Sequence, residues 1–445
     1  MRGGISARAV PTTREDGFLG RVSTRWRTGA FRHYVIVREG QVDPQDASLA
    51  NMTLIAPNHV EASTGRLLQT ASASEQGAES GKYWCDAGDV IYSKIRPALR
   101  KVAIAPHDCL CSADMYPLKG TNGLSNRFLY WYLLSEPFSD FAVQESARVA
   151  MPKLNRETLA DATLPLPSPG EQERIASFLD EQTARIDVLI AEKVKLVESL
   201  RAYQYSYSSR LMTRGMDEAA PRAMTSFPEL GETPRHWAVK RLKFLGDVRS
   251  GVAKGKDLGD KDTVTLPYLR VANVQDGYVD LSEISEIEVS ATEATRYLLC
   301  KGDVLMNEGG DNDKLGRGAV WQGQIDPCIH QNHVFAVRLT DPVLAEWVSR
   351  FTSTDAARAY FFLRSKQSTN LASINQSNVR ELPVPMPPDG ERASILSELR
   401  RMTSATTDLV EHAVEHIARL REYRSSLISA AVTGQLDIST HREAA

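Results

Sequence analysis

Two long stretches of the chain carry apolar residues at alternating spacings of four and three, a pattern typical of a helix that buries one stripe against another helix. The first seam comprises Ile175, Leu179, Gln182, Ile186, Leu189, Lys193, Leu196, Leu200, Tyr203 and Tyr207. The second comprises Ile395, Leu399, Met402, Thr406, Leu409, Ala413, His416, Leu420, Tyr423 and Leu427. Each position of the second seam follows its counterpart by 220 residues. We therefore predict two long helices with matching seams.

The segments around these helices repeat as well. Leu154-Asn155 recurs as Ile374-Asn375, again at a spacing of 220. Trp26 matches Trp237 at 211 and Gly88 matches Gly302 at 214, so the spacing drifts only before the helices. A repeat this long is a whole domain plus a helix, whereas a solenoid repeats one small unit. The sequence therefore predicts two similar halves.

Each helix follows a proline-punctuated segment and a globular segment. Prolines at alternate positions, Pro165 and Pro167 in one half and Pro385 and Pro387 in the other, enforce an extended path. The clearest strands are expected at 35–37, 90–92, 102–104, 320–321 and 334–337, and helical stretches at 126–141 and 342–362. This mixture predicts two similar α+β domains separated by an antiparallel coiled coil of two long helices, related by a pseudo-two-fold internal repeat.

The expected helix length favours packing of the two helices on each other. About 37 residues at roughly 1.5 Å each give a rod of roughly 55 Å, longer than one such domain is wide. The alternative is that each helix lies on its own domain. The expected divisions are a flexible N-terminus at 1–19, a first domain at 20–163, a proline linker and helix at 164–215, a linker at 216–231, a second domain at 232–383, a proline linker and helix at 384–432, and a tail at 433–445.

Composition narrows the class of protein. A chain of 445 residues is too long for a single hydrophobic core, so more than one domain is expected. A content of 42% hydrophobic and 24% charged residues is typical of globular proteins. No apolar run approaches the roughly 20 residues that span a bilayer, and no signal peptide is recognisable, so we expect a cytoplasmic protein with no membrane partner. The five cysteines include no Cys-x-x-Cys pair and are expected to be reduced. A net charge of −3 argues against indiscriminate nucleic-acid coating but allows local basic patches.

Several polar residues stand where side chains could reach DNA. Lys and Arg bind phosphates, while Arg, Asn and Gln distinguish bases. In the first half the candidates follow a strand: Lys94, Arg96, Arg100 and Lys101. In the second half they occupy a Gly-rich segment, a loop after the equivalent strand, and a later polar segment: Arg249, Lys254, Lys256, Asn312, Lys314, Arg317, Gln331 and Asn332. The alternative is that these residues belong to ordinary turns and solvated faces.

No catalytic or metal-binding constellation is recognisable. The chain has no Gly-rich methyl-donor loop and no phosphate-binding loop. Cys328, His330 and His333 share one short segment without a fourth ligand at a recognised spacing, so a packed or substrate-facing strand is the preferred interpretation. His416 lies in the predicted seam, where a polar residue fixes helix register. We expect no catalysis, no cofactor and no metal.

These features together resemble the specificity subunit of type I restriction-modification systems. They are the opening Thr233-Pro-Arg-His-Trp237, the strand Gly302-Asp303-Val304 with its partner Gly88-Asp89-Val90, the Leu164-Pro-Leu-Pro run leading to Glu171-Gln172-Glu173-Arg174-Ile175, and the repetition of the set. Two departures are Glu391-Arg392 in place of Glu-Gln, and Arg25-Trp26-Arg27 in place of a proline-led opening.

The resemblance implies a function. In that family each globular segment is a target recognition domain that reads one half of a split site in double-stranded DNA. The helices set the gap and bind two methyltransferase subunits, and a nuclease subunit joins some complexes. The roughly 55 Å rod would then correspond to about 16 base pairs at 3.4 Å each. Two other classes remain open: a coiled-coil adaptor that binds proteins, and an RNA reader, which would expose stacking aromatic residues.

Overall fold

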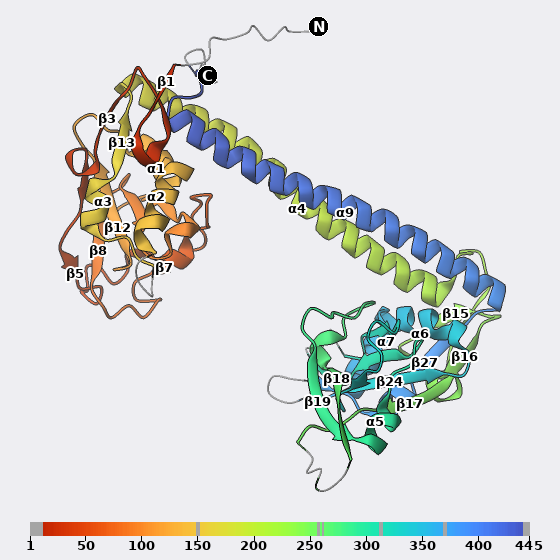
Figure 1. Cartoon of the computed structure of the whole chain (residues 1–445). Helices are drawn as coiled ribbons and strands as arrows, with labels where there is room; N and C mark the ends of the chain where they lie inside the picture. Colours follow the sequence, from red (N-terminus) through yellow and green to blue (C-terminus); the bar gives the residue numbers. More distant parts are fainter. Residues whose placement is uncertain are drawn as a thin grey trace, which may run out of the picture. The chain divides into compact units, whose positions relative to one another are not determined.

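The computed structural model describes residues 12–147, 152–255, 259, 262–310, 315–367 and 372–438. The chain divides into two compact units, a first unit of 1–195 with 413–445 and a second unit of 196–412. Each unit combines one α+β domain with segments of both long helices (Figure 1). The predicted fold class is confirmed. Among the described residues no helix has both the length and the hydrophobicity to span a bilayer.

The two domains share the order of their central sheets. The first sheet contains β4 (Val35–Val37), β9 (Val90–Ser93), β10 (Val102–Ile104) and β12 (Met115–Gly120), in the order β10-β9-β12-β4. The second contains β17 (Gly246–Ser250), β20 (Val304–Asn307), β22 (Gly318–Val320) and β24 (Val334–Leu339), in the order β22-β20-β24-β17. The two sheets have the same strand order, because each strand of the first sheet and its counterpart in the second come from equivalent positions of the repeat. The strands expected at 35–37, 90–92, 102–104 and 334–337 are confirmed, whereas the one expected at 320–321 lies earlier and ends at Val320.

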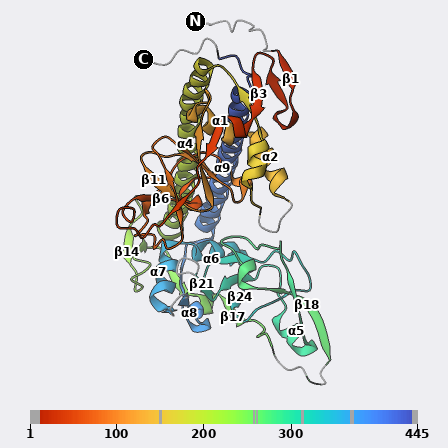
Figure 2. The ribbon, with the colours of Figure 1, turned by 90° about the vertical axis from the view of Figure 1, so that its left-hand side faces the viewer.

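A second sheet in each domain contains one parallel pair. In the first domain β6 (Thr53–Ile55) runs parallel to β11 (Cys109–Cys111), beside β5 (Gln41–Val42), β7 (Ala71–Ser72) and β8 (Lys82–Cys85). In the second, β18 (Thr263–Leu269) runs parallel to β23 (Ile329–His330) and antiparallel to β19 (Ser285–Ser290). The helix α5 (Ala291–Tyr297) lies against this β18–β19 hairpin (Figure 2).

The expected closing helices are each broken. The stretch at 126–141 forms α1 (Asn126–Leu134) and α2 (Glu136–Ser146), and the stretch at 342–362 forms η8 (Pro342–Leu344), α6 (Ala345–Thr352) and α7 (Asp355–Arg364). Ser135 and Thr354, with extended backbones, start the second helix in each case. Polar residues of this type favour helix starts over helix interiors because their side chains compete for backbone hydrogen bonds.

The proline-punctuated segments are extended, as predicted. β13 (Thr163–Leu166) pairs with β3 (Arg27–Ala30), and β27 (Pro383–Met386) pairs with β16 (Ala238–Arg241). Each follows a short helix, α3 (Arg156–Asp161) or α8 (Gln376–Arg380). Each thereby closes its domain directly before a long helix.

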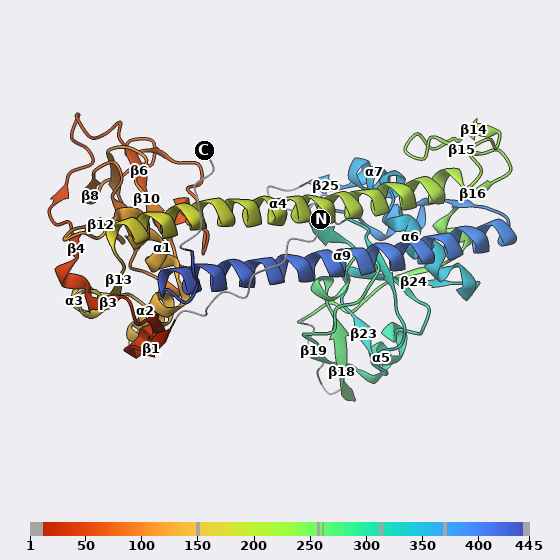
Figure 3. The same ribbon diagram turned by 90° about the horizontal axis from the view of Figure 1, so that it is seen from above.

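The long helices are longer than expected and antiparallel. α4 (Pro169–Arg214) has 46 residues and α9 (Asp389–Val432) has 44, more than the roughly 37 expected from the seams. In the first unit Arg424 Nε of α9 lies 2.9 Å from Asp187 Oδ1 of α4. In the second unit Tyr207 of α4 donates to Glu398 of α9 at 3.2 Å. The late part of one helix thus meets the early part of the other, side by side (Figure 3).

The predicted seams are buried mainly over their first four positions, and several later positions are exposed. Leu189, Leu196 and Tyr203 on α4 are 46%, 43% and 58% exposed, and on α9 Leu409 and Tyr423 are 55% and 58% exposed. His416 is exposed too, while its neighbour Ile417 is buried. A straight α-helix has 3.6 residues per turn, so its buried face drifts away from a strict seven-residue repeat by about 20° per heptad. The interpretation of His416 as a seam residue is therefore wrong.

The expected N-terminus, linker and tail contain ordered structure. β1 (Thr13–Glu15) pairs with β2 (Arg21–Ser23), so residues 12–19 are not the flexible segment that the sequence suggested. The linker at 216–231 contains β14 (Arg222–Met224), which pairs with β15 (Glu232–Pro234). In the tail Thr433 is buried, and its carbonyl accepts a hydrogen bond from Ser23 N.

Candidate nucleic-acid interface

Each domain contains a buried aspartate bound by arginine. In the first domain Arg38 Nε lies 2.5 Å from Asp89 Oδ2, and in the second Arg338 Nη2 lies 2.7 Å from Asp303 Oδ2. Arg249, the counterpart of Arg38 at the 211-residue spacing, lies 3.3 Å from the same Asp303 oxygen. The Asp303 side chain is 1% exposed, so it requires such partners. The guanidinium of Arg249, predicted to bind DNA, is thus engaged within the fold.

A basic cluster, defined as Lys94, Lys153 and Arg156, lies where β9 ends in the first domain. Lys94 Nζ stands 5.1 Å from the ring centre of Tyr116, and the Arg156 guanidinium stands 5.3 Å from it. Burial lowers the pKa of Lys94, and the nearby charge of Lys153 lowers it further. The backbone joins the cluster through the bridge between Ile95 and Lys153. Two cations against an aromatic ring, with the charge of Lys153 nearby, form a surface suited to a phosphate or a base, although Arg156 also pairs with Glu39 at 2.7 Å.

The other candidates after β9 differ in their availability. Arg96 is exposed, has the left-handed φ of 48°, and forms no ion pair with any residue in the described ranges. Arg100 Nη1 donates to Ser425 Oγ at 2.9 Å, and Lys101 Nζ donates to the Pro57 carbonyl at 2.5 Å. Arg96 is therefore accessible, whereas Arg100 and Lys101 hold parts of the first unit together.

The second domain places different chemistry at the same location. Leu154 N donates to the carbonyl of Lys94, and Ile374 N donates to that of Glu308, so Glu308 is the counterpart of Lys94. Glu308 Oε2 lies 2.6 Å from Nδ1 of the half-exposed His333. The register also places Ser373 opposite Gly309, where the first domain has Lys153 opposite Ile95. Lys94, Lys153 and Arg156 thus correspond to a carboxylate, a hydroxyl and the amide of Gln376, and His333 adds an imidazole beside the carboxylate.

Three short strands of the second domain form one small sheet after β20. β21 (Gly309–Gly310), β26 (Ala372–Ser373) and β25 (Lys366–Gln367) pair in the order β21-β26-β25. Gly310 pairs with Ala372 and Ala372 pairs with Gln367, so these three residues lie side by side at one end of that sheet. Asn312 and Lys314, like Lys256, lie outside the described residues. Arg317 is half-buried, and its carbonyl accepts from Asn307 N as that of Lys101 accepts from Ser93 N.

The remaining candidates come together beside β23. Gln331 N donates to the Leu269 carbonyl and Asn332 N donates to the Val252 carbonyl, both at 2.9 Å. Gly251 permits this approach, because a Cβ there would lie 2.0 Å from the His330 carbonyl oxygen. Lys254 follows two residues after Val252 and is exposed. Val252 pairs with Gln331 and accepts a hydrogen bond from Asn332. Lys254 is therefore only two residues away in sequence from the point where these two candidates bind.

Within the Cys328 to His333 segment, Cys328, Ile329 and His330 are packed, whereas His333 is half-exposed. His330 is 1% exposed, its Nδ1 lies 2.7 Å from the Val334 carbonyl, and burial lowers its pKa to about 4. Burial also raises the pKa of Cys328 to about 12. Among the described residues no group of three His, Cys, Asp or Glu side chains could hold a metal.

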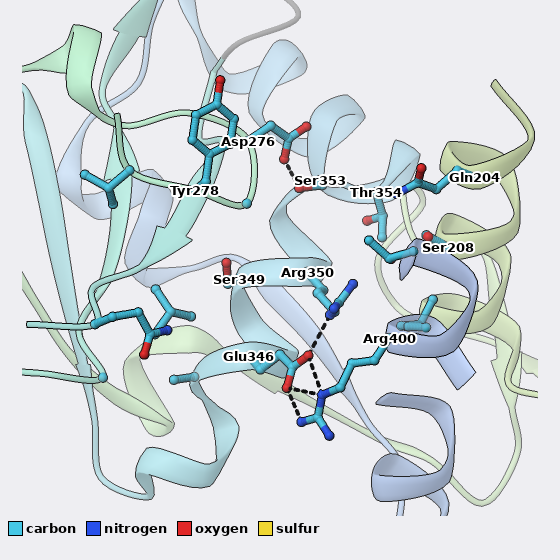
Figure 4. A pocket seen from close by; sticks show the side chains of 18 of the residues that line it. Gln204, Ser208, Asp276, Tyr278, Glu346, Ser349, Arg350, Ser353, Thr354 and Arg400 are labelled. Carbon is cyan, nitrogen blue, oxygen red and sulfur yellow. Dashed lines mark hydrogen bonds and ion pairs between the residues drawn. The ribbon is translucent and has the colours of Figure 1, made fainter. Parts of the chain in front are cut away.

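A cavity of 1210 Å³ opens in the second unit between α6 and the long helices (Figure 4). Glu346, Ser349 and Arg350 of α6 line one wall. Gln204 and Ser208 of α4 and Arg400 of α9 line the wall opposite (Figure 4). Most of its lining residues carry a hydroxyl, amide or charged group, so polar partners for a ligand are available around the cavity.

Sequence reasoning missed Lys153, Arg156 and the aromatic rings of the basic cluster. The signal was present but weak: Lys153 directly precedes Leu154-Asn155, the repeat landmark before α3. Only the bridge from Ile95 to Lys153 shows that this landmark lies beside the end of β9.

The comparisons with known proteins agree with this arrangement. The family model of the type I restriction modification DNA specificity domain matches residues 61–198, which include the end of β9 and the start of α4. A chain from a solved type I restriction-modification system superimposes with a TM-score of 0.70 over 93% of this chain and 99% of its own, at 16% identity. Residues 61–198 thus match a type I restriction modification DNA specificity domain, and the chain is similar to type I specificity subunits in sequence and fold.

Individual specificity subunits show how the similarity is distributed. The EcoDI specificity subunit of Escherichia coli is 37% identical over 139 residues, which are 31% of each chain. The EcoKI specificity subunit of Escherichia coli K12 is 23% identical over 337 residues, 74% of this chain and 70% of its own. The HsdS subunit from Thermoanaerobacter tengcongensis has the same fold at a TM-score of 0.50, over 93% of this chain. The chain thus aligns with about a third of the first relative and with most of the second.

Proposed function

We propose that this chain selects the DNA sequence for a type I restriction-modification complex in the cytoplasm and catalyses no reaction itself. Each domain reads one half of a bipartite site in double-stranded DNA, and the long helices determine the unread gap between the halves. One observation carries the proposal: two domains of the same strand order present opposite chemistry at the end of equivalent strands, Lys94 in one and Glu308 in the other. One scaffold with two different reading surfaces suits a target with two different halves.

The electrostatics of the two surfaces support a division of labour. The basic cluster and the exposed Arg96 offer the first domain several phosphate or guanine contacts. In the second domain Glu308 and His333 suit recognition of base amino groups, because a carboxylate accepts hydrogen bonds from cytosine N4 or adenine N6. The exposed Lys254 would supply a phosphate contact there.

The exposed apolar residues on the long helices support a partner role. Leu189 and Leu409 are repeat equivalents, as are Tyr203 and Tyr423, and all four are about half exposed. Leu189 and Tyr423 belong to the first unit, and Tyr203 and Leu409 to the second. Each unit thus exposes one leucine and one tyrosine of the same two repeat positions, as two copies of one partner require. We propose that each copy binds one methyltransferase subunit, with restriction subunits joining that assembly.

The test is DNA binding by the full chain assembled with its methyltransferase partner. We expect the logarithm of affinity to fall linearly with the logarithm of salt concentration, with a slope that reports several phosphate contacts. Lys94→Ala with Lys153→Ala should reduce that slope by roughly one to two units. Arg419→Ala, which removes a helix cation paired with Glu415, serves as the control and should leave the slope unchanged. Binding that does not respond to salt would instead favour the protein-binding adaptor.

Methylome sequencing tests the modular reading. Replacing residues 20–163 by the same segment of a relative should change one half of the methylated sequence only. Inserting seven residues into each long helix should lengthen the gap and leave both halves unchanged. A change in both halves after the domain replacement, or an unchanged gap after the insertions, contradicts the proposal.

A further inference from the structure

The contacts between each domain and its long helix carry opposite charges in the two units. The first junction is α1 against the start of α4, and the second junction is α6 against the start of α9. Arg127, the second residue of α1, corresponds to Glu346, the second residue of α6. Asp180 of α4 corresponds to Arg400 of α9 at the 220-residue spacing. In the first junction the domain contributes the arginine and the long helix the aspartate. In the second junction the domain contributes the glutamate and the long helix the arginine.

Hydrogen bonds show that both pairs are formed. In the first junction Arg127 binds Glu173 and Asp180, and Trp131 Nε1 donates to Asp180 Oδ1 at 2.9 Å. In the second, Arg400 Nε lies 3.0 and 3.1 Å from the two oxygens of Glu346 (Figure 4). Arg350 Nε donates to Glu346 at 2.9 Å as well. Burial alone would raise the pKa of Glu346, but the hydrogen bonds from Arg400 and Arg350 outweigh it and lower that pKa.

The helix surfaces facing the domains differ beyond this one position. On α4 the first domain meets Glu173 and Asp180. The counterparts on α9 are Ala393 and Arg400. The helix surface at the first junction is therefore acidic, and that at the second is neutral to basic.

The shapes of the two junctions differ as well. In the first unit the buried Arg424 donates to the carbonyls of Ser63 and Thr64 at 3.0 and 3.1 Å, and Tyr130 OH donates to Thr64 at 3.3 Å. The Trp131 ring lies beside the same guanidinium. The counterparts in the second unit are Gln204, Ser349 and Arg350, three of the residues that line the 1210 Å³ cavity. Because these counterparts are smaller, the second unit has a cavity at the place that Tyr130, Trp131 and Arg424 fill in the first unit.

We propose that this charge reversal assigns each domain to its own segment of the helix pair. If the domains changed places, Arg127 would face Arg400, and Glu346 would face Glu173 and Asp180. A single exposed ion pair contributes little, typically below about 1 kcal/mol. Discrimination depends on the difference between two arrangements, and the exchange replaces attraction by repulsion at several positions at once. The inference concerns assembly of the chain and is independent of the proposed DNA reading, so its test requires no DNA.

The test transfers the first junction's side chains into the second. The graft is the full-length chain with Glu346→Arg and Arg350→Trp. Arg400→Asp is then introduced into two backgrounds, the parent chain and the graft. In the parent chain Arg400→Asp should lower the melting temperature by about 2–4 °C, the shift expected for roughly 1 kcal/mol in a domain of this size. In the graft the same substitution should raise it, because the arginine introduced by Glu346→Arg gains the new aspartate as a partner. An equal decrease in both backgrounds overturns the proposal.

A control substitution and a double-mutant cycle in the first junction complete the test. Arg401→Asp removes the neighbouring cation, whose partner Glu398 is on the same helix, and should have the same effect in both backgrounds. If the graft does not fold, the first junction provides the cycle: Arg127→Glu, Asp180→Arg and the double variant. The double variant should recover most of the stability that the two single variants lose, and 1 M salt should reduce that recovery. Losses that simply add in this cycle overturn the proposal as well.

Discussion

Trp237 Nε1 donates a hydrogen bond to Glu391 Oε2 at 3.1 Å, which joins the opening of the second domain to the first turn of α9. The first unit repeats this relationship, with Trp26 Nε1 3.5 Å from Glu171 Oε1. Each glutamate also occupies the first turn of its helix, where a negative charge is favoured by the helix dipole. The two glutamates therefore connect the domain cores to the helix starts.

Glu391→Ala should reduce stability through this connection. The indole N–H loses its acceptor, His236 loses a contact of 2.7 Å, and the helix loses an acidic residue in its first turn. We expect a loss of about 1–3 kcal/mol in the free energy of unfolding, measured by urea denaturation. Glu411→Ala, an exposed helix residue, is the control. Equal stability of the two variants would show that the connection contributes nothing.

Asp303→Asn should destabilise the second domain. Asp303 accepts hydrogen bonds from Arg338 at 2.7 and 2.8 Å and from Cys300 N at 2.8 Å, and the asparagine cannot satisfy both guanidinium contacts. Hydrogen bonds to charged groups typically contribute about 2 kcal/mol, so we expect a loss of about that size. Glu286→Gln on β19 is an exposed control that should remain near the parent value. A loss below about 0.5 kcal/mol for Asp303→Asn would contradict the role assigned to the buried carboxylate.

His330 should make the second domain less stable in mild acid. Burial lowers its pKa from 6.5 to about 4, so the unfolded chain binds a proton between these pH values and the folded chain does not. Stability from this group is therefore complete above pH 6.5 and falls as the pH decreases to 4, by roughly 3 kcal/mol in total. The charges of Arg249 and Arg338 act in the same direction, and Asp303 opposes them.

Denaturation at pH 7 and pH 5 measures this effect. His330→Asn retains an N–H for the Val334 carbonyl but cannot titrate, so it should lose less stability than the parent between the two values. Substitution of the exposed His412 should leave the parent's pH dependence unchanged. Identical pH profiles for parent and His330→Asn would contradict the prediction.

Single substitutions on the helices should separate the two proposed partner surfaces. Leu189→Glu places a charge on the surface of the first unit only, and Leu409→Glu does so in the second. Each should reduce the methyltransferase subunits bound per chain from two to one, and the double variant to none, by mass photometry. Because both leucines are exposed, the melting temperature should remain within about 1–2 °C of the parent. Two subunits bound to the double variant would place the partner elsewhere.

The sequence by itself determined the duplicated organisation. The repeats at 211, 214 and 220 residues, the alternating prolines and the apolar periodicity are local signals, and they predicted two α+β domains and two long helices. The tertiary structure decided which side chains those elements bury. Leu189 and Tyr203 fit the predicted seam yet are exposed, because helix periodicity differs slightly from the heptad.

Only the tertiary structure separated accessible cations from engaged ones. Arg96 and Arg249 are indistinguishable as sequence candidates, but Arg249 faces the buried Asp303 across 54 residues of chain. The reversed pairs of Arg127 with Asp180 and of Glu346 with Arg400 join residues 53 and 54 positions apart. The contribution of a charged side chain depends on the groups that lie close to it in space, and local sequence patterns do not contain those distances.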